Sequence, residues 1–171
     1  MSAHRKPFPE FLRGFEETVQ SSATRLLTFS DNQSTERRRD DSWTRKQILG
    51  HLIDSAANNH QRFVRAQFTD ELAFPGYDGD QWVDVQRYNE AEWRQLVELW
   101  KLYNLHIARL ASYIPNSVLE LERTKHNLDQ IAFKTVDQKD PVTLEYFIRD
   151  YVDHMNHHLD QIFEKRSLDD I

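Results

Sequence analysis

The sequence has no cysteine among its 171 residues. Disulfides, iron–sulfur clusters, thiolate zinc sites and a cysteine nucleophile are therefore excluded, and a reducing, cytoplasmic location is expected. There are only four glycines, and they do not have the spacing of a phosphate loop or of a dinucleotide-binding fingerprint. Both motifs need glycines where the backbone closely approaches the ligand, so the common kinds of ATP and NAD site are excluded.

Positive charge and long apolar runs are also scarce. The 22 lysines and arginines face 28 aspartates and glutamates, which gives a formal net charge of −6. Nucleic acid is not an expected partner, because broad phosphate-binding surfaces work by neutralising phosphate with Lys and Arg. No run of about 18 apolar residues is present, and no apolar stretch follows the basic residues near the start. We therefore expect neither a membrane span nor a signal peptide.

The length of the chain corresponds to about one domain, so we expect a single domain over residues 1–171. Proline, which removes a hydrogen bond inside a helix, occurs at only five positions. Four stretches that are nearly free of it have apolar residues at helical spacing: 8–29, 44–63, 89–114 and 143–163. This pattern predicts an all-α protein, and specifically a four-helix bundle.

Three polar residues are expected to mark helix starts. Thr44 with Gln47, and Asn89 with Glu92, have the spacing of a capping box, in which each side chain can bond an unpaired amide at the start of a helix. Thr143 is expected to cap the last helix.

The connection between the second and third predicted helices is long. It covers residues 69–88 and includes Tyr77 and Trp82, so we expect it to pack over one end of the bundle. The two aromatic side chains either line the mouth of a pocket or pack the connection onto the helices. A further short helix is expected around residues 118–122.

The histidines provide the strongest sign of chemistry. His154 and His158 are about 40° apart around the last helix, one turn from each other, and can hold one metal ion together. His51 lies at the edge of the apolar face of the second helix and can reach inward, whereas His157 points further toward the surface. The alternative for each histidine is a hydrogen-bonded structural role at the edge of the core.

Other metal chemistries lack their motifs. Ferritin-like di-iron bundles need Glu-x-x-His on two helices, and no histidine here follows a glutamate by three residues. A His-Glu-x-x-His zinc helix and a Gly-x-Ser-x-Gly nucleophile elbow are also missing. The segment 78–84 has the glycine of a calcium loop in the wrong place and is interpreted as a capped turn.

Three separated stretches carry a family resemblance. Residues 43–55 (WTRKQILGHLIDS), residues 76–82 together with 86–88, and residues 143–158 occur in the same order as in the DinB/YfiT-like metalloenzyme superfamily, which this chain resembles. The resemblance implies a four-helix bundle of the DinB/YfiT-like type with one divalent ion bound by His51, His154 and His158. Members are described as metal-dependent hydrolases or as transferases that join a low-molecular-weight thiol to an electrophile, and some form homodimers.

The leading hypothesis is therefore an enzyme that acts on a small molecule. Three imidazoles would hold a zinc or nickel ion, which activates water or a thiol. The alternative is a non-catalytic, stress-associated bundle that uses the metal for stability or for binding a partner, or that binds no metal. No catalytic residue is assigned. Asp54, Asp150 and Asp153 are equally plausible as partners of the imidazoles and as surface charges, and the role of His126 stays open.

Overall fold

The computed structural model describes residues 6–37 and 42–164. In chain order its helical elements are α1 (Phe8–Leu26), α2 (Asp31–Ser34), α3 (Arg45–Arg65), α4 (Gly79–Gln86), the 3₁₀ helix η1 (Tyr88–Glu90), α5 (Trp93–Ser112), α6 (Asn116–Leu119), α7 (Leu128–Ile131) and α8 (Leu144–Phe163). No helix in these two ranges is both long enough and apolar enough to cross a membrane.

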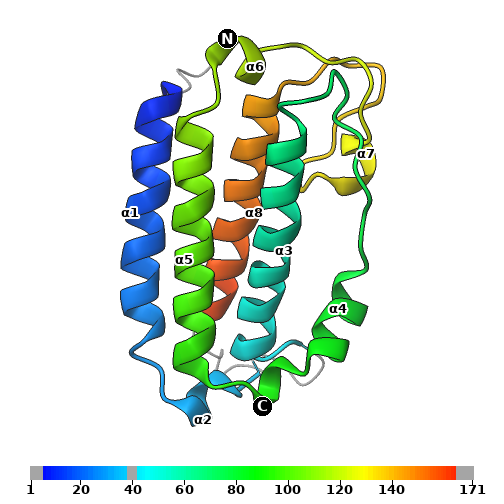
Figure 1. Ribbon diagram of the computed structural model, residues 1–171. Helices are drawn as coiled ribbons and strands as arrows, with labels where there is room; N and C mark the ends of the chain where they lie inside the picture. Colours follow the sequence, from blue (N-terminus) through cyan, green and yellow to red (C-terminus); the bar gives the residue numbers. More distant parts are fainter. Residues whose placement is uncertain (1–5, 38–41, 165–171) are drawn as a thin grey trace.

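The four long helices α1, α3, α5 and α8 form the predicted bundle (Figure 1). Helix α3 packs against α5 and α8, and α1 packs mainly against α5. Figure 1 shows that α3 and α5 run in the same direction, and that the connection 66–92, which carries α4, returns along the outside of α3. The expectation that this connection packs over one end of the bundle is therefore wrong, because two parallel neighbours can be joined only by a segment that travels back along their length.

Two of the three predicted helix starts are confirmed. The Thr44 hydroxyl accepts the Gln47 N–H at the start of α3 in a complete capping box, and the Thr143 hydroxyl accepts a backbone N–H at the start of α8. The predicted capping box at Asn89 is wrong. Asn89 lies in η1 and its Oδ1 accepts a hydrogen bond from the Thr44 hydroxyl at 2.6 Å, so it ties η1 to the start of α3 instead of capping α5.

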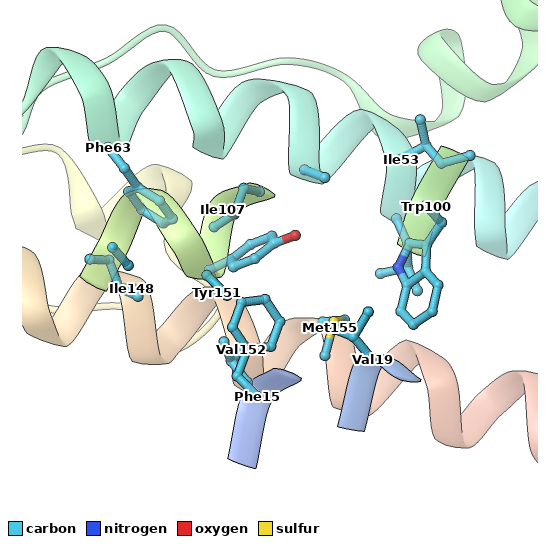
Figure 2. Packing of buried hydrophobic residues seen from close by; sticks show 14 of the residues in the cluster. Phe15, Val19, Ile53, Phe63, Trp100, Ile107, Ile148, Tyr151, Val152 and Met155 are labelled. Carbon is cyan, nitrogen blue, oxygen red and sulfur yellow. The ribbon is translucent and has the colours of Figure 1, made fainter. Parts of the chain in front are cut away.

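The core of the bundle is rich in large side chains (Figure 2). The ring of Tyr151 on α8 meets Phe15 of α1 and Phe63 of α3 edge to face, with centroid distances of 6.3 and 5.8 Å. Its hydroxyl donates to Oδ1 of Asn104, which is itself fully buried on α5. Such aromatic pairs add about 0.5–1.5 kcal/mol each beyond burial of their area. One side chain thus links all four long helices and fixes α8 against α3, the two helices that carry the predicted histidine site.

Candidate metal centre

The structure brings the three predicted histidines together. His51 projects from α3 and His154 and His158 project from α8, and one ring nitrogen of each lies within 4.8 Å of the others. His51 Nε2 and His154 Nε2 are 3.3 Å apart. The three rings meet nearly edge to face, with centroid distances between 4.6 and 5.2 Å.

Neighbouring side chains orient two of the rings. His158 Nδ1 is 2.8 Å from Oε1 of Gln161, and His154 Nδ1 is 3.4 Å from the hydroxyl of Ser55. An imidazole that donates through Nδ1 leaves Nε2 unprotonated, so the contact with the Gln161 carbonyl oxygen favours the tautomer of His158 that can bind a metal ion through Nε2. The Ser55 hydroxyl can donate to or accept from His154 Nδ1, and its contact fixes the orientation of that ring. His51 Nδ1 is buried without a hydrogen-bond partner among the described residues.

His51 is held sterically, by the start of α4. A Cβ atom added at Gly79 would lie 3.3 Å from Cε1 and 3.4 Å from Nδ1 of the His51 ring. The ring also contacts the indole of Trp43, at a centroid distance of 5.1 Å. Gly79 therefore allows α4 to approach the ring closely, and both α4 and the indole border the ring.

Burial keeps these imidazoles neutral. Desolvation lowers the pKa of His51 to about 4, and the positive charge that His158 would carry lowers it further. Desolvation also lowers the pKa of His154 to about 3, with additional repulsion from neighbouring histidines. The pKa of His158 is lowered as well, mainly by desolvation. At neutral pH all three rings are thus unprotonated at one nitrogen, which is the form that binds metal.

The donor set fits a divalent ion. Two nitrogens at ordinary zinc–nitrogen distances in a tetrahedral site are about 3.3 Å apart, which matches the separation of His51 Nε2 and His154 Nε2. Without an ion the same distance corresponds to one weak hydrogen bond between the rings. That bond requires one Nε2–H, and it gives no reason for the third imidazole to converge on the same point. Three imidazoles leave at least one coordination position open, as catalytic sites require.

A cavity of about 350 Å³ opens beside two of the three histidines, His51 and His154. One wall is the face of α3 that carries His51, Ser55, Asn59 and Arg62, and the opposite wall belongs to α8 and includes His154. Residues 76–79 and 130–133 close the sides. The ring of Phe133, which also lines the cavity, lies 5.5 Å from that of His154.

The three aspartates considered as partners of the imidazoles have other contacts. Asp54 Oδ1 accepts from the Tyr88 hydroxyl and the Gln86 amide, both at 2.7 Å. Asp150 accepts backbone N–H groups of residues 133–134, and Asp153 pairs with Lys134 at 2.6 Å. None of them has a hydrogen bond to an imidazole in the described ranges. Desolvation raises the pKa of both Asp54 and Asp150.

Two other histidines are not among the three converging side chains. His157 is exposed and its ring contacts Gln161, in agreement with the prediction that it points outward. His126 is buried, and its two ring nitrogens contact the Asp140 carbonyl and the Leu128 N–H. Both nitrogens are occupied by backbone, so the structure gives His126 a structural role.

Several residues of the cavity and around the histidines were not predicted from the sequence. Ser55 and Asn59 follow His51 at intervals of four residues and Arg62 comes three residues later, so all lie on one face of α3. Gln161 follows His158 by three residues. Helical spacing from the histidines would have found these positions, but it does not distinguish a cavity from solvent.

Fold and site together define a four-helix-bundle protein with a three-histidine cluster shared between two of its long helices. The chain matches the family model of the DinB superfamily over residues 15–162 and belongs to that superfamily.

Two comparisons with individual proteins agree with this assignment. The chain is 26% identical over 155 residues to "Putative metal-dependent hydrolase YfiT" of Bacillus subtilis (strain 168), covering 91% of this chain and 82% of that protein. It also resembles a solved structure described as "YfiT from Bacillus subtilis is a probable metal-dependent hydrolase with an unusual four-helix bundle topology". The TM-score is 0.74 at 20% identity, and the match covers 95% of this chain and 89% of the other. At this identity the structural likeness shows the fold.

Proposed function

We propose that this protein is a metal-dependent hydrolase of a small molecule, and that His51, His154 and His158 hold its single divalent ion. The observation that carries the proposal is the convergence of three neutral imidazoles within 4.8 Å of one another, two of which, those of His51 and His154, line a cavity of about 350 Å³. The name of the Bacillus subtilis relative, a putative metal-dependent hydrolase, supports hydrolysis as the reaction class. Imidazole donors suit zinc and nickel, which are the ions we expect.

Some residues of the site would bind the metal ion, and others position the imidazoles that bind it. Ser55 and Gln161 hold two imidazoles by their Nδ1 atoms, and the ring of His51, which α4 borders, supplies the third donor. When bound, the ion would supply Lewis acidity, which makes water, or a thiol, a better nucleophile at neutral pH.

Metal content tests the site directly. Protein purified without a histidine tag or chelator should contain about one zinc or nickel ion per chain by elemental analysis, and the variant His154→Ala/His158→Ala should contain almost none. His157→Ala is the matched control, because His157 lies on the same helix but is exposed and outside the cluster. No metal in the wild-type protein, even after reconstitution with zinc and with nickel, would refute the proposal.

Activity separates hydrolysis from the other functions of such a site. Simple esters and amides should be hydrolysed by the metal-loaded protein without added thiol, and the activity should be lost in His158→Ala. Turnover only after a thiol is supplied would reassign the site to an S-transferase. A large loss of thermal stability on chelation, with no turnover of any electrophile, would indicate a structural ion in a non-catalytic bundle.

Two further properties are predictions of the same proposal. We expect a cytoplasmic protein, to be tested by cell fractionation. We also expect a homodimer, to be tested by light scattering at several protein concentrations.

A further inference from the structure

A buried arginine lines the same cavity as His51 and His154. Arg62 is only 5% exposed and lines the cavity from α3, about three turns or roughly 16 Å along the helix from His51.

The charge of Arg62 is not neutralised by the protein. No carboxylate in residues 6–37 and 42–164 forms an ion pair with it. Its guanidinium donates to the Pro75 carbonyl at 2.8 Å and, more weakly, to Oδ1 of Asn59 at 3.4 Å. A guanidinium has five N–H groups, so three remain for a ligand. Burial of a charge without a counter-charge costs folding free energy. We therefore expect a ligand of opposite charge to pair with such a group in the functioning protein.

The carboxylate on the opposite wall does not supply that counter-charge. Asp150 accepts the backbone N–H groups of Phe133 and Lys134 at 2.8 and 2.7 Å, and these contacts hold the segment that closes one side of the cavity. The remaining polar groups near the arginine are neutral at pH 7, including Asn59 and the phenol of Tyr77. The cavity therefore has an anion-binding end at Arg62 and a histidine end.

We infer that Arg62 binds an oxyanion of the substrate, a carboxylate or a phosphate, and so selects elongated anionic substrates whose reacting bond lies at the histidine end. The inference rests on the proposed function for the reacting end, but the binding of the anion itself needs neither metal nor turnover. The planar fork of a guanidinium matches the two oxygens of a carboxylate or phosphate, and a hydrogen bond in which both partners are charged is about twice as strong as a neutral one.

Anion binding to metal-free protein tests this inference. Binding of acetate, succinate and inorganic phosphate is measured by isothermal titration calorimetry at constant ionic strength, with neutral acetamide as the uncharged probe. We expect at least one of the three anions to bind and acetamide not to bind. Comparison of the two carboxylates with phosphate identifies the preferred oxyanion. Arg62→Gln, which removes the charge and retains an amide donor for the Pro75 carbonyl, should weaken binding about ten- to hundredfold.

Two further variants separate ligand binding from a structural role. Arg65→Gln changes an exposed arginine on the same helix and should bind the anion like the wild type. Arg62→Lys keeps the charge but loses the fork, and should bind more weakly than the wild type and more tightly than Arg62→Gln. Circular dichroism shows whether each variant is folded. If Arg62→Gln does not fold, the anion affinity of Arg62→Lys is compared with that of Arg65→Gln. Weaker binding by Arg62→Lys alone would then support the inference.

The inference is overturned if the wild-type protein binds none of the three anions. It is also overturned if folded Arg62→Gln or Arg62→Lys binds as tightly as the wild type. Because the measurement is made without metal, a failure of the metal proposal leaves its result unchanged.

Discussion

Gly50 allows η1 to pack directly on α3, next to the histidine site. A Cβ atom added at Gly50 would overlap Cδ2 and Cγ of the Tyr88 ring. Tyr88 is only 7% exposed, and its hydroxyl bonds Oδ1 of the buried Asp54 at 2.7 Å. Gly50→Ala must therefore move a packed ring and break or lengthen a hydrogen bond to a carboxylate.

Three contributions set the size of the effect. Alanine is favoured over glycine inside a helix by about 1 kcal/mol. Against this gain, overpacking of a filled site costs about 1–3 kcal/mol, and loss of a hydrogen bond to a charged group costs about 1.5–3 kcal/mol. We therefore expect Gly50→Ala to lower the free energy of unfolding by about 2–5 kcal/mol, which corresponds to a decrease in Tm of roughly 5–15 °C for a chain of this size.

Urea unfolding followed by circular dichroism measures this change. Gly14→Ala is the matched control, because Gly14 also lies inside a long helix but has nothing within 4 Å of an added Cβ atom. That variant should gain up to about 1 kcal/mol. In a Tyr88→Ala background, Gly50→Ala should no longer be destabilising. A Gly50→Ala protein as stable as Gly14→Ala would refute the steric argument.

Two predictions concern the histidines themselves. In metal-free protein, burial holds the pKa of His51 near 4 and that of His154 near 3, below the ordinary 6.5, so between pH 6.5 and 5 the unfolded chain binds protons that the folded chain does not. The free energy of unfolding should thus fall as pH decreases, by at most about 1.4 kcal/mol per pH unit for each histidine. Urea unfolding at pH 7, 6 and 5 measures it, and the slope should flatten in His51→Ala/His154→Ala; the same slope in both proteins would contradict the assignment. Gln161→Ala removes the acceptor at His158 Nδ1 and should weaken zinc binding about 10- to 100-fold in a chelator competition, whereas unchanged affinity would show that Gln161 does not position the ring.

Much of the site could be predicted from residues that are close together in the sequence. His154 and His158 lie one turn apart on a helix whose apolar face is evident from the sequence, so their convergence on the bundle interior is a property of the helical repeat. The starts of α3 and α8 were also predictable, since a capping threonine bonds an amide three residues away. Placing His51 opposite this pair needed the helices to be packed correctly, and the sequence supported that only through the family resemblance.

The sequence by itself determined the four long helices, their apolar faces and the histidine pair, because hydrogen bonds and side-chain spacing within a helix depend on residues three or four positions apart. Only the tertiary structure decided that α3 and α5 run in parallel, that Asn89 bonds Thr44 instead of capping α5, and that Arg62 faces a cavity instead of solvent. Each of these depends on contacts between segments far apart in the chain. Such contacts arise from the packing of the whole bundle and leave no periodic pattern around the residues concerned.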